Sequence, residues 1–345
     1  MNASHRLRVV VTGATGNVGT SLVRALSRDP DVGSVLGLAR RLPDLTLPGV
    51  AWHRADLSRP DSEQVLGDLL AGADAVVHLA WRFQPTHDPV VTWRSNVEGS
   101  MRVFDAVRAA GVPALVHASS VGAYSPGPKQ EPGVDEGWPT HGWPDAAYCR
   151  EKAYLERVLD TFELRNPGIR VVRMRPGFLF KETSASEQRR IFGGTHLPGM
   201  LIRPDLLPLV PDLDGLRFQV LHTDDAAEAY RLAVTGDARG PFNLAADTVT
   251  DARALGELLD ARVVRAPVPV VRAALATAWH ARAVPASPHL FDAVLRLPVM
   301  DCTRAREVLG WRPRYSASEA LTAFLSGAVR GSGEPTAPMA GSRWS

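Results

Sequence analysis

The chain has 345 residues, 45% apolar and 22% charged, and a formal net charge of +2. This composition is typical of an ordinary globular protein, and without a basic block it argues against a nucleic-acid partner. Two cysteines, Cys149 and Cys302, cannot build a disulfide framework, no apolar signal core stands at the start, and no run is long enough to cross a membrane. We therefore expect a cytoplasmic protein with no membrane partner.

Short apolar runs alternate with helical patterns over the first half of the chain. Strands are expected near residues 8–12, 33–39, 50–54, 74–80, 113–119 and 169–175, and helices near 17–28, 61–71, 89–110 and 145–165. This alternation predicts an α/β fold with a doubly wound parallel sheet (Rossmann) and right-handed crossovers. The turn-rich stretch 124–145 is long enough to be a functional loop.

The second half of the chain has shorter and more mixed patterns. A helix is expected at 186–192, a strand at 217–222, and further helices at 224–235, 267–283 and 316–328. Residues 331–345 have no apolar period, so we expect a disordered tail there.

The first predicted strand runs directly into a glycine-rich turn. Gly13, Gly16 and Gly19 follow one another at i, i+3 and i+6, immediately before and within a helical pattern that begins near Asn17. Glycines at this spacing permit a tight turn, close approach of the backbone to a diphosphate, and close packing of helix on sheet. The strand, turn and helix context makes this a dinucleotide-binding motif.

Tyr148 and Lys152 stand four residues apart in a chain that has three lysines and thirty-six arginines. Residues at i and i+4 share a helix face, so the ammonium can lie beside the phenol or beside a ligand that both touch. A phenol titrates roughly three pKa units above the value that suits a general acid or base near neutral pH. A nearby cation supplies part of that shift, although a solvated helix pair is the alternative.

Together these motifs resemble the short-chain dehydrogenase/reductase superfamily, in its extended, NAD(P)-dependent epimerase/dehydratase-like branch. Further matches lie between residues 8 and 325: Asp56-Leu57, His78-Leu79-Ala80, Asn96-Val97-Glu98-Gly99, Ser119-Ser120, Arg175-Pro176-Gly177, Val220 to Asp225, and Arg304 to Trp311. The resemblance implies a dinucleotide-binding Rossmann domain over 1–180 and a mainly substrate-binding region over 181–330, with about 217–250 returning to the Rossmann core.

The resemblance also implies catalytic residues. Ser120 would hydrogen-bond the substrate oxygen, and Tyr148 would exchange a proton with that oxygen. Lys152 would hold the nicotinamide ribose and lower the pKa of the phenol. Ser119 is the alternative to Ser120, and Asn96 is a further candidate that orders a water or its own helix, or else caps a turn.

The resemblance also implies a binding site for NADP or NAD. Its expected residues are Gly13, Thr15, Gly16, Asn17, Val18, Gly19, Arg40, Arg41, Asp56, Leu57, Leu79, Ala80, Tyr148, Lys152 and Pro176. NAD enzymes of this fold usually place an acidic residue after the second strand, whereas this chain has Arg40 and Arg41, which can pair with a 2′-phosphate. We therefore expect NADP. Asp44 keeps NAD as an alternative, and exposed arginines without a ligand are the remaining explanation.

Two positions depart from the pattern of nucleotide-sugar enzymes. Phe178 stands where many of them have a polar run, and Phe218 where they often have an arginine for the diphosphate. The candidates for an aromatic pocket are Trp81, Phe83, Trp93, Trp138, Trp143 and Phe178, with plain core as the alternative. Four arginines could still reach a phosphate: Arg189, Arg190, Arg203 and Arg217.

Three functions follow. We expect an NADP(H)-dependent oxidoreductase that acts on a carbonyl or alcohol of a small, largely apolar molecule. An epimerase or dehydratase of a nucleotide sugar that retains NAD is the second hypothesis, and a non-catalytic cofactor-sensing protein is the third.

The sequence also leads to expectations about assembly and metal binding. The apolar stripe Val97, Met101, Phe104 and Val107 fits either a homodimer formed through the helices near 89–110 and 145–165 or the core. His78, His117 and His222 stand at strand ends without metal-ligand spacing, so we expect no metal site.

Overall fold

The computed structural model describes residues 5–194 and 208–341, and its central element is a seven-stranded parallel sheet. The strand order is β10-β6-β5-β4-β1-β2-β3. The bounds are β1 Leu7–Thr12, β2 Val32–Ala39, β3 Val50–Arg54, β4 Ala75–His78, β5 Ala114–Ala118, β6 Arg170–Pro176 and β10 Gly240–Leu244. The order reverses between β1 and β4, and in open α/β sheets ligands bind in the crevice at that switch point.

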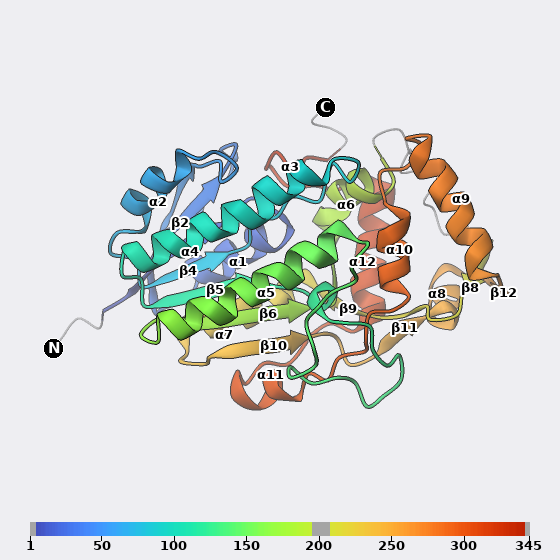
Figure 1. Cartoon of the computed structure of the whole chain (residues 1–345). Coiled ribbons are helices and arrows are strands. Elements are labelled where there is room, and N and C mark those ends of the chain that lie inside the picture. Colours follow the sequence, from blue (N-terminus) through green and yellow to red (C-terminus); the bar gives the residue numbers. More distant parts are fainter. Residues whose placement is uncertain (1–4, 195–207, 342–345) are drawn as a thin grey trace.

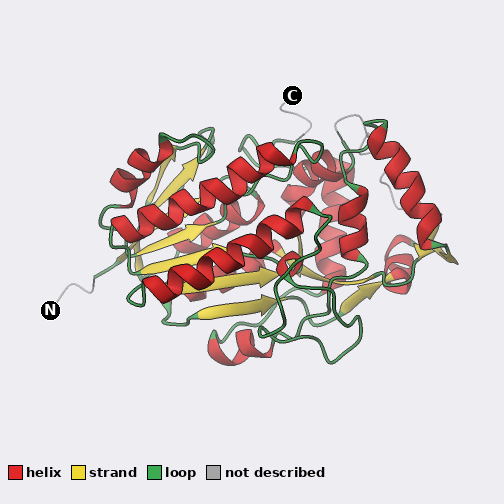
Figure 2. Ribbon diagram, viewed as in Figure 1, coloured by secondary structure: helices red, strands yellow, loops and turns green. Residues whose placement is uncertain are grey.

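Helices cover both faces of this sheet (Figures 1 and 2). α1 (Asn17–Ser27) and α7 (Thr223–Thr235) lie on one face, and α2 (Ser62–Leu70), α4 (Gly99–Ala109) and α5 (Ala147–Arg165) lie on the other. Successive strand residues point to opposite faces, so Val9 and Val11 pack toward α1 and α7 while Val10 packs toward α2, α4 and α5. The expected doubly wound α/β fold is confirmed.

The helix expected over 89–110 is instead three consecutive segments. α3 (Pro89–Trp93) begins where Asp88 accepts a hydrogen bond from the Val91 amide, and a π-helical turn at Arg94–Glu98 leads into α4. Single π-helical turns inside α-helices are frequent at functional sites. Here the turn contains Asn96.

The remaining elements gather at the carboxyl ends of the sheet strands (Figure 1). Two small sheets are formed by β7 (Phe178–Phe180), β9 (Arg217–His222) and β11 (Val249–Asp251), and by β8 (Leu209–Asp212) with β12 (Arg262–Arg265). The helices of this part are α6 (Ala185–Phe192), α8 (Ala252–Leu259), α9 (Val268–His280), α10 (Pro288–Val294) and α12 (Ala317–Arg330). α11 (Thr303–Val308) lies by β10.

The disordered tail expected from residue 331 is wrong for residues 331–341, which pack against the sheet domain. Met339 is completely buried, and Glu334 forms an ion pair with Arg24 of α1. The sequence has no apolar period there because a few anchoring side chains, rather than a regular element, hold this segment. Residues 342–345 lie outside the described part. None of the described helices is long and apolar enough to cross a bilayer.

Candidate active site

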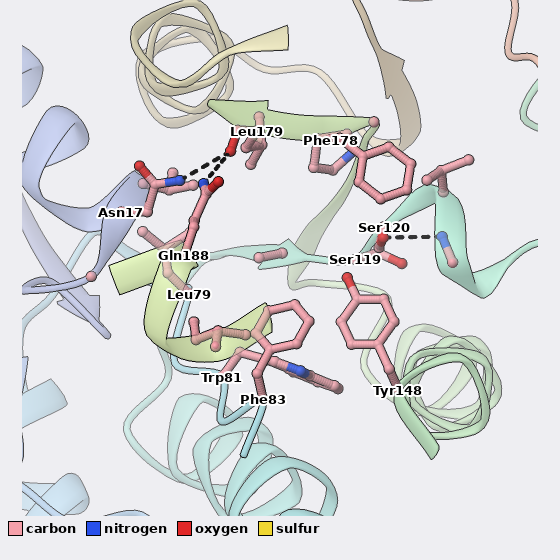
Figure 3. A pocket seen from close by; sticks show the side chains of 18 of the residues that line it. Asn17, Leu79, Trp81, Phe83, Ser119, Ser120, Tyr148, Phe178, Leu179 and Gln188 are labelled. Atoms are coloured by element: carbon pink, nitrogen blue, oxygen red, sulfur yellow. Dashed lines mark hydrogen bonds between the residues drawn. The ribbon is translucent and has the colours of Figure 1, made fainter. Parts of the chain in front are cut away.

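Two adjoining hollows open at the carboxyl edge of the sheet. The first, of about 270 Å³, lies beside Tyr148 and Ser120, and we call it the inner cavity (Figure 3). The second, of about 170 Å³, lies along the ends of β2 and β4, and we call it the outer groove. Gly13, Gly16, Leu79, Trp81 and Glu187 line both, so the two hollows are continuous around the glycine turn.

The glycine turn has the geometry that a dinucleotide needs. Gly13 adopts a φ of +67°, and a Cβ atom there would lie 2.6 Å from the Ala80 nitrogen. At Gly19 a Cβ would overlap the Gly13 carbonyl oxygen. α1 begins at Asn17, so its N-terminal amides and the positive end of its dipole meet both hollows beside Gly16. The residues present therefore fit a diphosphate.

Tyr148 and Ser120 meet in the inner cavity. Tyr148 lies in the first turn of α5, Ser120 follows β5, and their hydroxyl groups point toward each other in Figure 3. The Ser120 Oγ accepts a hydrogen bond of 3.0 Å from the Gly122 amide. The Ser119 Oγ instead donates to Glu156 at 2.5 Å. Of the two serines, Ser120 has the hydroxyl that is available to a substrate.

The pKa of the Tyr148 phenol is shifted opposite to the expected direction. Burial raises this pKa, and the hydrogen bond with Ser120 opposes the shift only in part. Lys152 does not counter it, because its ammonium donates to the Ala118 carbonyl at 2.6 Å and lies under the Trp81 ring, 3.4 Å from the centroid. Burial lowers the pKa of Lys152 to about 7. In this arrangement Lys152 lines neither hollow.

A buried ion network holds α5 in register with β6. Arg175 donates through Nε and Nη2 to the two carboxylate oxygens of Glu156, each at 2.9 Å, and Arg173 donates to the same carboxylate at 2.9 Å. Burial alone would raise the pKa of Glu156, but these two arginines outweigh it and lower that pKa to about 2. Because Glu156 lies one turn after Lys152, the network fixes the helix that carries Tyr148 and Lys152.

Asn96 neither caps a turn nor faces the inner cavity. Its Oδ1 accepts from the Arg82 amide at 2.7 Å, and its Nδ2 donates to the Arg82 carbonyl at 2.9 Å and to Glu151 at 2.7 Å. The side chain therefore ties the loop after β4 to α5. That loop carries Trp81 and Phe83, so Asn96 sets the wall of the site, and Asn96 itself lines the outer groove.

The two arginines that follow β2 differ in their position relative to the outer groove. Arg40 lines the groove together with Arg82, Asp56, Leu57 and Ala80, whereas Arg41 does not. Burial lowers the pKa of Arg40, and the charge of Arg82 lowers it further. Asp44 also lies off the groove; its amide donates to the Pro335 carbonyl. Asp56 accepts two hydrogen bonds from Ser58.

Aromatic and aliphatic side chains form most of the inner cavity. Trp81, Phe83 and Phe178 line it as expected, and Trp93, Trp138 and Trp143 do not. Phe83 stacks on Tyr148 with ring centroids 4.9 Å apart (Figure 3). Sequence reasoning missed the other wall, which is Glu187, Gln188, Ile191, Phe192, Leu290, Val294 and Leu297. The i, i+4, i+7 spacing of Leu290, Val294 and Leu297 was the available signal.

Charge is nearly absent from the inner cavity. Among the described residues that line it, Glu187 is the single charged side chain, and burial raises its pKa to about 7. Arg189, Arg190 and Arg217 do not line it, and Arg203 lies outside the described residues. The cavity therefore offers no described cation to a diphosphate.

The histidines at the strand ends are embedded in the sheet. His78 pairs with Thr12 at 2.6 Å and with Ser100 at 2.8 Å, and burial lowers its pKa to about 3. His117 packs against His78 with ring centroids 5.5 Å apart. Over residues 5–194 and 208–341, no three metal-ligating side chains lie together.

Known proteins show clear similarity to this chain. The model of the NAD dependent epimerase/dehydratase family matches residues 9–245. A 3-diazoavenalumate denitrifying reductase from a Streptomyces species is 30% identical over 331 residues, which is 90% of this chain and 97% of that protein. Sterol demethylase protein B of Methylococcus capsulatus is 29% identical over 67% of this chain and 70% of its own length.

The same architecture occurs in a solved epimerase. The UDP-glucose 4-epimerase of Thermus thermophilus, in complex with NAD, superposes with a TM-score of 0.69 at 21% identity. The match covers 94% of this chain and 99% of the epimerase. At this identity the match establishes the fold.

Proposed function

The chain belongs to the NAD dependent epimerase/dehydratase family, and on that premise we propose an NADP(H)-dependent oxidoreductase that reduces a carbonyl, or oxidises an alcohol, of a small and largely apolar molecule. Ser120, Tyr148 and Lys152 are the proposed catalytic residues.

The chemistry of the inner cavity carries this proposal. A nucleotide sugar brings a diphosphate, and burying two phosphate charges requires cations or hydrogen-bond donors. The cavity beside Tyr148 instead presents Phe83, Phe178 and Phe192 and a carboxyl group from Glu187. Apolar surface of this kind favours an apolar ligand, and none of the described residues that line this cavity is a cation that would stabilise a diphosphate. The chemistry of the inner cavity therefore favours a substrate without a diphosphate over a nucleotide sugar.

Two relatives support the same choice by name. The relative at 30% identity is a reductase, and the one at 29% is a sterol demethylase protein, and neither name contains a nucleotide sugar. The similarity to the solved epimerase rests on the fold, and the family model over residues 9–245 covers epimerases and dehydratases without choosing a substrate. An aromatic or otherwise apolar substrate is consistent with both relatives and with the cavity.

Reduction needs a proton donor beside the substrate oxygen, and the Tyr148 phenol lines the inner cavity next to Ser120. When bound, the nicotinamide supplies a hydride to the substrate carbon. Tyr148 gives its phenolic proton to the substrate oxygen, which Ser120 holds by its hydroxyl. Lys152, whose ammonium lies under the Trp81 ring in the structure, would hold the nicotinamide ribose and place a positive charge beside this pair. Solvent then reprotonates the phenol.

NADPH is the proposed reductant because Arg40 lines the outer groove without an acidic residue at the end of β2. Burial and the charge of Arg82 both disfavour the Arg40 guanidinium and lower its pKa, and the Asp56 carboxylate in the same groove offsets them only in part, so a further anion would stabilise the Arg40 charge. A 2′-phosphate meets that requirement, whereas a ribose hydroxyl does not.

The test is to follow loss of NADPH absorbance with a panel of aryl and aliphatic ketones and aldehydes, beside a panel of nucleotide sugars. We expect carbonyl-dependent loss of NADPH that falls by at least about a thousandfold in Tyr148→Phe while NADPH binding is retained. Isomerisation of a nucleotide sugar without net NADPH loss, abolished in the same variant, would reject the proposal in favour of an epimerase.

A further inference from the structure

The segment 333–341, which we call the C-terminal hook, folds back onto the dinucleotide-binding turn. Its own ends close on each other, because the Glu334 amide donates to the Met339 carbonyl at 2.9 Å and the Met339 amide donates to the Thr336 carbonyl at 3.1 Å. Figure 1 shows this last part of the chain passing between the first strands and α6. The hook is therefore an ordered loop that touches both halves of the molecule.

One side of the hook is anchored to α1, the helix that begins at the diphosphate site. Arg24 donates two hydrogen bonds to the Glu334 carboxylate, at 2.9 and 2.6 Å. Lys181 lies 4.0 Å from the same carboxylate and donates to Thr20 and Ser21 of α1. Both carboxylate and ammonium are almost completely buried, so this anchor is shielded from solvent.

The other side of the hook is anchored to α6, across the hollows from α1. Arg190 donates to the carbonyl groups of Pro338 and Ala340, at 2.7 and 2.9 Å. The same helix carries Glu187, which lines both hollows. The hook thus joins the sheet domain to the substrate side at the place where the two hollows meet.

The hook also touches the site itself. Pro338 lines the outer groove with Thr15, Gly16 and Arg40. The Thr336 hydroxyl donates to the Thr15 carbonyl at 2.9 Å and so fixes a peptide in the middle of the glycine turn. The Pro335 carbonyl accepts from the Asp44 amide and so holds the loop after β2, next to Arg40.

We propose that the C-terminal hook is part of the cofactor site: it closes the adenosine and diphosphate half of the groove and must open for a dinucleotide to leave. This inference rests on the cofactor part of the proposed function and not on the reaction. Its consequence is slow release of cofactor, because contacts with α1, α6, the glycine turn and the loop after β2 hold the hook in place.

The test compares cofactor release in the full chain, in a chain that ends at Ser332, and in a control chain that ends at Gly341. Release of NADPH is timed by its fluorescence after displacement with excess NADP⁺, with no substrate present. We expect the chain that ends at Ser332 to release NADPH at least about tenfold faster, and the control chain to match the full chain. An unchanged release rate in a folded chain that ends at Ser332 would overturn the proposal.

If the chain that ends at Ser332 does not fold, two point variants test whether the hook is part of the cofactor site. Thr336→Val removes the hydrogen bond to the glycine turn, and Pro338→Gly removes the wall of the groove; Thr277→Val on exposed α9 is the matched control. We expect weaker binding of NADPH and of adenosine 2′,5′-bisphosphate in both hook variants, with no change for nicotinamide mononucleotide. Affinities within about twofold of the parent for all three ligands would overturn the proposal.

The two proposals fail in different ways. A parent chain that binds neither NADPH nor NADH contradicts the cofactor assignment and the hook together. A parent chain that binds and reduces carbonyl compounds, with hook variants that release NADPH at the parental rate, contradicts the hook alone.

Discussion

At the scale of single residues, the groove distinguishes side chains that look equivalent in the sequence. Arg40 and Arg41 are adjacent, yet only the first lines the outer groove, and Asp44 is turned away with its amide bonded to the hook. Ser119 and Ser120 are likewise adjacent. The Ser119 hydroxyl donates a hydrogen bond to the buried Glu156 carboxylate, whereas the Ser120 hydroxyl points toward that of Tyr148. Neighbours in a strand end or tight turn point in different directions, so one position decides the chemistry.

Arg40→Ala is expected to weaken NADPH binding by about 10- to 100-fold and to leave NADH binding almost unchanged. The physical reason is that a hydrogen bond to a charged group contributes about 1.5–3 kcal/mol, and only NADPH has the 2′-phosphate. Fluorescence titration measures both affinities. Arg41→Ala is the control and should change neither; equal losses in the two variants would contradict the assignment of Arg40.

NADPH affinity is expected to fall as the pH rises from about 7 to about 9.5. Burial lowers the pKa of Lys152 to about 7, so the ammonium loses its proton across this window and with it the attraction for the cofactor. The 2′-phosphate is already doubly charged above about pH 7 and adds no opposing trend. Lys152→Met should bind weakly with a shallower pH profile, and the remaining fall comes from Glu187, which has a pKa of about 7 and becomes negatively charged beside the same groove. A parent profile that is equally shallow would contradict this role.

At the scale of elements, packing decides which glycines can be replaced. Gly327 lies in α12 where a Cβ would overlap the carbonyl oxygen of Glu182 at the start of the segment that leads to α6. Gly67 lies in α2 with nothing within 4 Å of the corresponding position. Both are helical glycines, and an alanine has better helix propensity at each, so the difference comes from tertiary contact alone.

Gly327→Ala is expected to lower the free energy of unfolding by about 1–3 kcal/mol, because the added methyl group forces α12 away from its neighbour. Gly67→Ala should raise that free energy by about 0.5–1 kcal/mol, because alanine loses less backbone entropy in a helix. Urea denaturation measures both. Shifts of the same sign would show that the close approach of α12 is not as described.

At the scale of the whole molecule, most of the stripe expected at a dimer interface is core. Val97, Phe104 and Val107 are buried between the helices and the sheet, and Met101 is 38% exposed. Other apolar side chains are exposed on the outer side of these helices: Trp93 of α3 packs against Tyr154 of α5, with ring centroids 5.0 Å apart. A homodimer through α4 and α5 remains a prediction, with a different set of contact residues.

Light scattering at micromolar concentration is expected to give about twice the chain mass of 37.2 kDa. Met101→Glu should shift the mass toward one chain, because it puts a charge into a desolvated interface. Val308→Glu on α11, which is also an exposed apolar position, is the control and should leave the mass unchanged. A single-chain mass for the parent protein would remove the dimer.

Local pattern was sufficient for the parts that depend on neighbours in sequence. The period of apolar residues predicted the strands and main helices of the first half to within a few residues. The glycine spacing predicted the tight turn between β1 and α1, and the i, i+4 pair predicted a common helix, α5, for Tyr148 and Lys152. These features are set by backbone geometry and short-range side-chain direction, which the sequence contains.

Contacts between distant segments decided the rest. The cover of Trp81 over Lys152, the wall of the inner cavity from α6 and α10, and the hook on the glycine turn each join residues that lie far apart in the chain. No periodic signal records them, because each is held by a few side chains whose partners are chosen by the packed fold. The direction of the Tyr148 pKa shift follows from the same cause, since burial is a property of the assembled core.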